Sequence, residues 1–370
     1  MVMKMSWVPQ LDIVFLGLSI TSAWGNGHAT TYRALARALT RRGHRVLFLE
    51  RDVPWYAAQR DMPAPTFAQT ALYRDLKELR ERWTRAIRSA DLVILGSYVP
   101  EGVAVGHWML SEARGVRAFY DIDTPITLSK LAARDHEYVD AELVRGVDLY
   151  LSFSGGRALE LLEHVHGARL ARALYCSAEP DLHHPLPAPP RWDLGFLGTF
   201  SEDRQPALER LLLAPARQLE RSRFVVAGSQ YPPEVEWPPN VARREHVTPA
   251  EHPVFYGSQR FTLNLTRAEM IRLGSSPSVR LFEAAACGVP VISDRWDGLE
   301  ELFVPGEEIL IADDAEDVVT ALSELDDRAA RRIGTAARRR VFAGHTAAHR
   351  ARELERHYVE ALSASAPIRR

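Results

Sequence analysis

Short hydrophobic runs alternate along the chain with stretches in which hydrophobic residues recur every three or four positions. The runs predict buried strands of a parallel sheet, and the helical spacing predicts the helices that cover it. In the first half, strands are expected over residues 11–19, 45–50, 91–97, 116–121 and 148–153. Helices are expected over 29–42, along the hydrophobic stripe from Leu72 to Ile87, and from near Pro125. This β–α–β alternation predicts a doubly wound α/β domain.

The pattern is interrupted between residues 180 and 190, which include five prolines, a composition that stiffens and extends a chain. The alternation then starts again. Strands are expected over residues 193–198, 223–228, 261–266, 289–293 and 308–311, with charged helices from about 315 to 362. The sequence therefore predicts two Rossmann-like domains joined by a proline-rich linker.

Residues 275–290 place one carboxylate, Glu283, in a predicted helix of small and apolar residues. Ser276, followed by a proline, is expected to cap the start of this helix, and Gly288 to end it. A helix N-terminus suits a phosphate, because its N–H groups are free and its dipole is positive there. Arg280 lies about one turn before Glu283. Either Glu283 binds a ligand, or it forms an ion pair with Arg280 on a half-buried helix.

The run from Ser276 through Glu283 to Gly288 resembles the nucleotide-sugar-binding helix of retaining GT-B glycosyltransferases, those of glycosyltransferase family 4, and its form is closer to the CgeB-like (spore-maturation-type) branch. The resemblance implies that Glu283 holds the donor ribose hydroxyls. It also implies donor contacts from Arg280, Ser276, Ser278 and Val279. Family 4 carries a further Glu eight positions earlier, where this chain has Ser275.

The same resemblance implies the GT-B architecture, two Rossmann-like doubly wound domains with a cleft between them. Residues 1–186 would form the N-terminal, acceptor-side domain. Residues 187–345 would form the nucleotide-sugar-binding domain, and residues 346–370 a helix that crosses back to the first domain.

Two loops of the first domain carry candidate chemistry. Gly25, Asn26, Gly27 and His28 follow the first strand, where doubly wound sheets bind ligands, and the loop is similar to the one that faces the donor diphosphate in GT-B enzymes. The glycines could equally serve a turn. His28 could be a base, a sugar ligand or a helix cap.

Asp121 and Asp123 close another predicted strand, where family 4 enzymes have a His-containing loop that contacts the transferred sugar. Here aspartates replace that loop. One interpretation gives them a role in catalysis. Another makes Asp123 or Thr124 the cap of the next helix. Asp121 and Asp123 also match the Asp-x-Asp pattern of a metal pair, a rival to metal-independent chemistry.

In the second domain, residues 195–204 resemble the strand and loop that carry the diphosphate-binding Arg of retaining GT-B enzymes. Thr199 and Arg204 are the candidates there. The Lys that typically follows in the family is absent. Arg204, helped by Arg267 or Arg280, is therefore expected to neutralise the diphosphate, because a guanidinium can make bidentate contacts to phosphate oxygens.

Composition narrows the class of protein. A chain of 370 residues suits two domains, and its 46% hydrophobic and 25% charged residues are typical of globular proteins. The formal net charge of −2 gives no indication of a nucleic-acid partner. Cys176 and Cys287 fall in different predicted domains and support neither a disulfide framework nor a zinc site. The apolar run 11–20 is too short to span a bilayer and lacks a signal-peptide cleavage site, so we expect a cytoplasmic protein. Peripheral membrane contact stays open.

The expected activity is transfer of a sugar from a nucleotide-diphosphate sugar to an unidentified acceptor, in bacterial glycan biosynthesis. The resemblance implies retention, no metal, and no cofactor beyond the donor co-substrate. Catalytic candidates are Asp123, Asp121, His28 and Arg204. Donor-binding candidates are Glu283, Arg280, Ser276, Ser278, Val279, Gly25, Asn26, Gly27, Thr199 and Arg267. A non-transferring, epimerase-like enzyme and a catalytically silent nucleotide-sugar-binding protein of the same fold remain alternatives.

Overall fold

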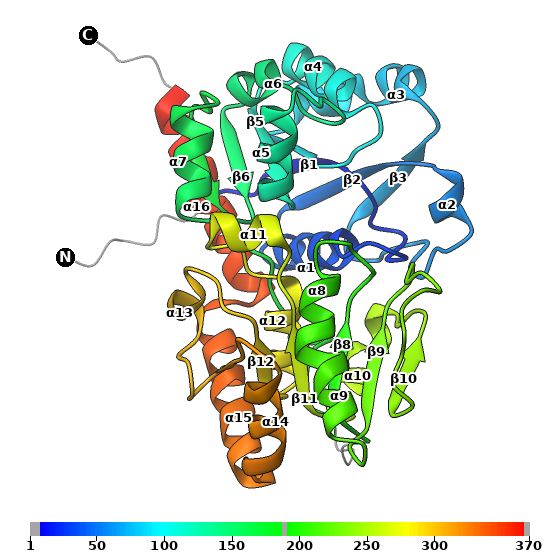
Figure 1. Ribbon diagram of the computed structural model, residues 1–370. Coiled ribbons are helices and arrows are strands. Elements are labelled where there is room, and N and C mark those ends of the chain that lie inside the picture. Colours follow the sequence, from blue (N-terminus) through cyan, green and yellow to red (C-terminus); the bar gives the residue numbers. More distant parts are fainter. Residues whose placement is uncertain (1–7, 187–190, 366–370) are drawn as a thin grey trace, which may run out of the picture. The chain divides into compact units, whose positions relative to one another are not determined.

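The computed structural model describes residues 8–186 and 191–365, which form two compact units (Figure 1). The N-terminal unit comprises Met1–Ala23, His28–Tyr175 and Ala348–Arg370, and the C-terminal unit comprises Trp24–Gly27 and Cys176–Ala347. The expected boundary at 186/187, and three of the five prolines of the predicted linker, lie at or beyond the edge of the described residues.

The N-terminal unit is built on a parallel sheet of seven strands in the order β3-β2-β1-β4-β5-β6-β7. The strands are β1 (Asp12–Gly17), β2 (Arg45–Arg51), β3 (Gln69–Tyr73), β4 (Leu92–Gly96), β5 (Val116–Asp121), β6 (Leu149–Ser152) and β7 (Ala171–Ala173). The helices are α1 (His28–Arg41), α2 (Pro54–Ala57), α3 (Leu76–Ser89), α4 (Gly102–Glu112), α5 (Thr124–Ala132), α6 (Ala141–Gly146), α7 (Arg157–His164) and α16 (Ala347–Ser365). The strand order reverses between β1 and β4, as in a doubly wound fold.

The continuous apolar strands form because the centre of this sheet is buried on both faces. Val14 of β1 lies in register with Leu47 of β2 on one side and with Val93 of β4 on the other. Phe15 stacks on Phe48, with ring centroids 6.0 Å apart.

The last helix, α16, is tied to the N-terminal unit through Glu355. This carboxylate accepts hydrogen bonds from both Nε and Nη2 of Arg42 and lies 2.9 Å from Nε2 of His44. Burial opposes its ionisation, but Arg42 and His44 hold the pKa of Glu355 below its ordinary value.

The C-terminal unit contains a second parallel sheet, of six strands in the order β10-β9-β8-β11-β12-β13. The strands are β8 (Trp192–Leu197), β9 (Phe224–Ala227), β10 (Val241–Arg244), β11 (Gln259–Asn264), β12 (Val291–Ser293) and β13 (Leu310–Ile311). The helices are α8 (Gln205–Leu208), α9 (Ala214–Gln218), α10 (His252–Gly257), α11 (Ala268–Leu273), α12 (Val279–Ala286), α13 (Leu299–Leu302), α14 (Ala315–Glu324) and α15 (Asp327–Gly344). A π-helical turn, Glu209–Leu213, joins α8 to α9, and a short 3-10 helix, Pro249–Glu251, precedes α10. The two sheets confirm the predicted fold class.

Some local predictions were wrong. Leu72 belongs to strand β3, not to a helix, because Asp75 starts α3 by accepting a hydrogen bond from the backbone N–H of Glu78. Ser276 does not cap α12: its hydroxyl donates to the carbonyl of Gly274, and the helix begins at Val279 with Ser278 at the N-cap. The predicted stop is confirmed, since Gly288 follows the helix with φ of +77°.

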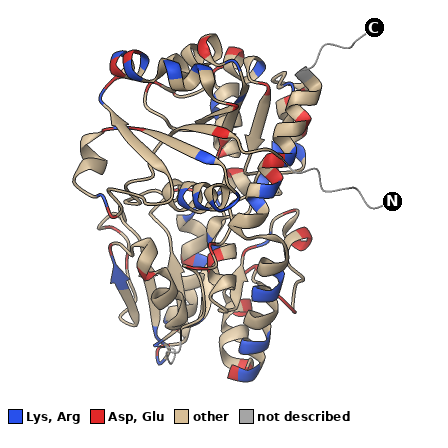
Figure 2. Ribbon diagram, turned by 180° about the vertical axis from the view of Figure 1, so that it is seen from behind, with Lys and Arg blue, Asp and Glu red and all other residues tan. Residues whose placement is uncertain are grey.

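Basic and acidic residues are interspersed over the helices and loops of both units (Figure 2). Within the described part of the chain, no helix combines the length and the hydropathy needed to cross a bilayer.

Candidate functional site

The carboxyl edge of the C-terminal sheet gathers most of the predicted donor-binding residues. The strand order reverses between β8 and β11, and ligands of doubly wound sheets bind outside the strand ends at such a point. The segment after β8 carries Thr199 and Arg204, and the segment after β11 carries Arg267. Topology therefore brings together residues that are far apart in the sequence.

Arg204 is affected by two other guanidinium groups here, those of Arg280 and Arg267. Arg204 donates from Nη2 to the carbonyl of Thr199 at 2.8 Å, while its Nε is buried without a hydrogen-bond partner. Burial, together with the positive charges of Arg280 and Arg267, lowers the pKa of Arg204 to about 10. Arg267 lies 3.4 Å from one carboxylate, that of Asp203. A buried cation that two neighbouring cations destabilise, and whose Nε–H has no acceptor, is suited to an anionic ligand.

Arg280 is fixed by the sheet. Its Nε donates to the carbonyl of Leu197 at the end of β8, and its Nη1 donates to Oδ1 of Asn264 at the end of β11, 3.1 Å away. Its guanidinium lies 4.8 Å from the ring centroid of Phe196. Arg280 is therefore directed at the edge of the sheet and does not form the ion pair with Glu283 that the sequence left open.

The loop that follows β8 is held in place because its backbone packs closely against the backbone at the end of β9. A Cβ at Gly228, where φ is +150°, would lie 2.0 Å from the carbonyl oxygen of Gly198, so only glycine fits there. The hydroxyl of Tyr231 donates to that same carbonyl at 3.1 Å. The start of the segment that carries Thr199 and Arg204 is thus held against the end of β9. Sequence analysis missed Gly228 and Tyr231.

The N-terminus of α12 lies beside this group through Ser278. The hydroxyl of Ser278 donates to Oδ1 of Asn264 at 2.7 Å, the same atom that Arg280 contacts. Ser278 makes no side-chain cap to the helix, and Val279 is the first helical residue. The first N–H groups of α12 are therefore not satisfied by the N-cap side chain and suit an anion.

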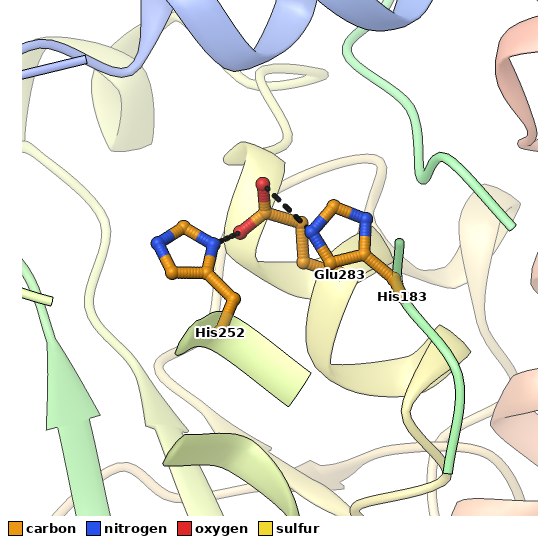
Figure 3. A group of neighbouring side chains, drawn as sticks. All are labelled: His183, His252 and Glu283. Carbon is orange, nitrogen blue, oxygen red and sulfur yellow. Dashed lines mark ion pairs between the residues drawn. The ribbon is translucent and has the colours of Figure 1, made fainter. Parts of the chain in front are cut away.

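Glu283 lies beside two histidines of the same unit that the sequence analysis missed (Figure 3). Its Oε1 lies 3.5 Å from Nε2 of His183 and its Oε2 lies 3.2 Å from Nδ1 of His252. The hydroxyl of Tyr256 donates to Oε2 at 3.3 Å. Only 2% of the Glu283 side chain is exposed. His183 falls in the proline-rich segment and His252 begins a helix that was not predicted, so neither stood out.

In the N-terminal unit, the two candidate aspartates point to different partners. Asp121 is fully buried; its Oδ2 accepts a hydrogen bond from Tyr150 at 2.7 Å and its Oδ1 accepts one from Thr127 at 2.9 Å. Burial raises the pKa of Asp121 to about 6, against the effect of these donors. Asp123 instead accepts from the hydroxyl of Tyr98 at 3.1 Å. Asp121 is thus a satisfied buried acceptor, and Asp123 does not cap α5 with its side chain.

The structure brings Asp123 together with His28 through Tyr98, which sequence analysis missed. The ring of Tyr98 lies 5.5 Å from that of His28. Tyr98 has φ of +61°, a conformation that non-glycine residues rarely adopt and that clusters at functional sites. His28 is the first residue of α1; its Nδ1 is buried without a hydrogen-bond partner, and burial lowers its pKa to about 4. These residues follow β1, β4 and β5 at one edge of the N-terminal sheet.

The remaining predicted residues, Gly25, Asn26 and Gly27, precede α1. Gly25 has φ of +66°, which a turn requires of glycine. A Cβ at Gly27 would meet no atom within 4 Å, so packing does not demand a glycine there. The predicted contact of this loop with a donor diphosphate stays a prediction.

Comparisons with known proteins agree with this geometry. Residues 204–356 match a family model described as "Glycosyl transferase-like". The chain resembles HepE of Anabaena, solved with UDP and glucose, at a TM-score of 0.71 and 13% identity over 96% of this chain and 100% of that one. It also resembles sucrose-phosphate synthase from Thermosynechococcus elongatus, at a TM-score of 0.69 and 17% identity over 95% of this chain and 100% of that one. The fold is GT-B. A comparison with curated proteins gave no match.

A third GT-B neighbour is an alpha-glucosyltransferase solved with UDP and DNA, at a TM-score of 0.68 and 11% identity over 95% of this chain and 100% of that one. The segment that matches the glycosyl transferase-like model contains Arg204, Arg267, Arg280 and Glu283. His28, Tyr98 and Asp123 lie outside the matched segment. The match to the glycosyl transferase-like model therefore surrounds the arginine group, in a chain with a GT-B fold.

Proposed function

We propose that this protein is a glycosyltransferase that binds a nucleoside-diphosphate sugar in its C-terminal unit. The observation that carries the proposal is the group of Arg204, Arg267 and Arg280 at the switch point of the sheet. Burial and the charges of Arg280 and Arg267 lower the pKa of Arg204, so its charge is unfavourable in the unliganded fold, and a diphosphate supplies a compensating negative charge.

In this proposal the leaving diphosphate is stabilised by groups already in place. Arg204 offers its unfilled Nε–H, and Arg280 is held by Leu197 and Asn264. The N-terminus of α12 adds N–H groups and a positive dipole. Preorganised donors of this kind commonly supply the largest part of catalysis, because they need no rearrangement as charge develops. They take the place of a metal, and retention follows the family 4 resemblance.

The proposal assigns the donor ribose to Glu283. One oxygen, Oε1, has no hydrogen bond from the chain and retains lone pairs for a hydroxyl. Since its side chain is almost entirely covered, the groups that cover it must move before a ribose reaches it. For this reason the donor assignment rests on the arginines and not on Glu283.

The acceptor-side chemistry is assigned to the N-terminal unit. His28 is neutral at pH 7, because burial lowers its pKa to about 4, so it suits a hydrogen bond to a sugar hydroxyl better than it suits proton abstraction. Asp123, held by Tyr98, is the candidate base. Asp121 is assigned a structural part, because both of its oxygens already accept hydrogen bonds.

The test is a thermal-shift and product assay on the full chain. HepE and the alpha-glucosyltransferase have been solved with UDP-glucose, so UDP and UDP-glucose are the first probes. A ligand at a hundred times its Kd should stabilise the fold by about 2.7 kcal/mol. Release of UDP that depends on an added sugar acceptor would support transfer. Conversion of UDP-glucose to another UDP-sugar would indicate an epimerase, and stabilisation without any turnover would indicate a binding protein.

A further inference from the structure

His183, Glu283 and His252 form a buried group of side chains in the C-terminal unit. Among the described residues, they are the set of histidine and acidic side chains whose ligand atoms all lie within 4.8 Å of one another. Nε2 of His183, Nδ1 of His252 and Oε1 of Glu283 are buried and lack a well-formed hydrogen bond. Such a group either holds a metal ion or fixes the carboxylate.

The hydrogen bond at Nδ1 of His183 decides between a metal site and a group that positions the Glu283 carboxylate. The backbone N–H of Glu179 donates to Nδ1 of His183 at 3.2 Å, so Nδ1 presents a lone pair. Burial lowers the pKa of His183 to about 4, which keeps the ring neutral at pH 7. A neutral imidazole with a lone pair on Nδ1 carries its proton on Nε2. The nitrogen that faces Glu283 is therefore a donor, whereas a metal ligand needs a lone pair there and a proton on the other nitrogen.

The carboxylate accordingly has three potential donors from two separate segments. His183 approaches Oε1 from the segment that precedes residue 187, while His252 and Tyr256, both on α10, approach Oε2. Burial alone would raise the pKa of Glu283, but His252, His183 and Arg280 together bring it below the ordinary value. An ionised carboxylate is otherwise expensive to bury.

We propose that His183 and His252 are positioning residues, which hold Glu283 ionised and in one orientation for the donor ribose. The inference rests on the proposed function, because ribose recognition is what it explains. With Oε2 taken by His252 and Tyr256, and Oε1 facing His183 at 3.5 Å, the orientation leaves Oε1 as the acceptor for a hydroxyl. Loss of either imidazole donor lets Glu283 take up a proton or turn away.

Amide variants provide the test, because they reproduce one imidazole nitrogen at a time. A glutamine amide nitrogen reaches the place of Nε2 and an asparagine amide nitrogen reaches that of Nδ1. His183→Gln and His252→Asn therefore keep an N–H donor that faces Glu283. His183→Asn and His252→Gln carry the same amide group, but its nitrogen does not reach the position of the imidazole nitrogen that faces Glu283. The Kd of UDP and of 2′-deoxy-UDP is measured by calorimetry on the full chain for all four variants and the wild type.

The wild type should prefer UDP over 2′-deoxy-UDP by roughly tenfold, the effect of one charge-assisted hydrogen bond. His183→Gln and His252→Asn should keep that preference within about threefold, and the mismatched pair should lose it. Should His183→Asn not fold, the two variants at the more exposed His252 make the same comparison.

The outcomes separate the inference from the proposed function. An equal ribose preference in the wild type and in all four variants would overturn the inference and leave the donor site intact. One equivalent of bound zinc in the purified wild type, lost in every variant, would overturn it in favour of a metal centre. Failure of the wild type to bind UDP would overturn both.

Discussion

Replacing Arg204 by glutamine tests the donor site most directly, because a ligand-binding cation and a structural one respond in opposite ways. In the unliganded protein the Arg204 charge is unfavourable: burial, Arg280 and Arg267 lower its pKa to about 10. At 1.36 kcal/mol per pKa unit, this corresponds to roughly 3 kcal/mol of stability that the charge costs the fold. A diphosphate reverses the sign of this contribution.

Two terms set the expected result. The variant loses the hydrogen bond from Nη2 to the carbonyl of Thr199, worth about 1–2 kcal/mol, and no longer carries the cost of burying a charge beside two other cations. Its free energy of unfolding should therefore stay unchanged or rise by about 1–2 kcal/mol. UDP affinity should fall by about 10- to 150-fold, since charge-assisted hydrogen bonds to phosphate contribute roughly 1.5–3 kcal/mol.

Denaturant unfolding without ligand and calorimetric titration with UDP measure the two quantities. Arg295→Gln is the matched control, because it removes a guanidinium from the same unit. Arg295 pairs with Asp313 and its side chain is 58% exposed, so this variant should change neither the free energy of unfolding nor the affinity for UDP. A variant at Arg204 that loses more than about 2 kcal/mol of stability while binding UDP like the wild type would refute the reasoning. Arg204 would then be a structural residue and the anion site would lie elsewhere.

Three further predictions concern the surroundings of this site. Gly228→Ala should destabilise the protein by about 3 kcal/mol or more, because its Cβ would collide with the carbonyl of Gly198; unfolding in urea measures this, and a neutral result would contradict the backbone packing. Acidification from pH 7 to pH 5 should cost the wild type about 2 kcal/mol that His183→Gln does not lose, since the unfolded chain binds a proton that the buried ring excludes until about pH 4; parallel pH-dependent curves would contradict it. Sugar transfer should survive EDTA, and activity that vanishes with EDTA and returns with Mg²⁺ or Mn²⁺ would reassign the chemistry to a metal site.

The central strands of both sheets could be predicted because burial on two faces imposes continuous apolar runs. β5 (Val116–Asp121) has the predicted bounds. Helix starts were harder, because a serine can bond to a local carbonyl as readily as it caps a helix. Ser276 does the first and donates to Gly274. The strand β10 (Val241–Arg244) was missed because it is short, its last two residues are arginines, and it pairs with β9 alone.

The candidate site also contains residues that could be predicted from the sequence and residues that could not. Arg204 and Arg280 could be proposed from motif resemblance, and topology places both at one edge of the sheet. His183 and His252 could not, since their meaning depends on tertiary distances to Glu283. The strained φ of Tyr98 likewise leaves no mark in the sequence. Residues of a motif are thus visible in a sequence, whereas the partners that orient them are not.

Arg280 and Glu283 show how partners that the sequence does not reveal affect ligand binding. Opposite charges three residues apart on a helix can pair, and from the sequence alone that was a sound alternative. The fold separates them instead. Leu197 and Asn264 accept hydrogen bonds from Arg280, and His183, His252 and Tyr256 approach Glu283. An Arg280 neutralised by an adjacent carboxylate would have little charge to offer a phosphate. By holding Glu283 through His183, His252 and Tyr256, the protein leaves the Arg280 guanidinium at the sheet edge without a direct carboxylate partner and keeps an ionised carboxylate one turn away.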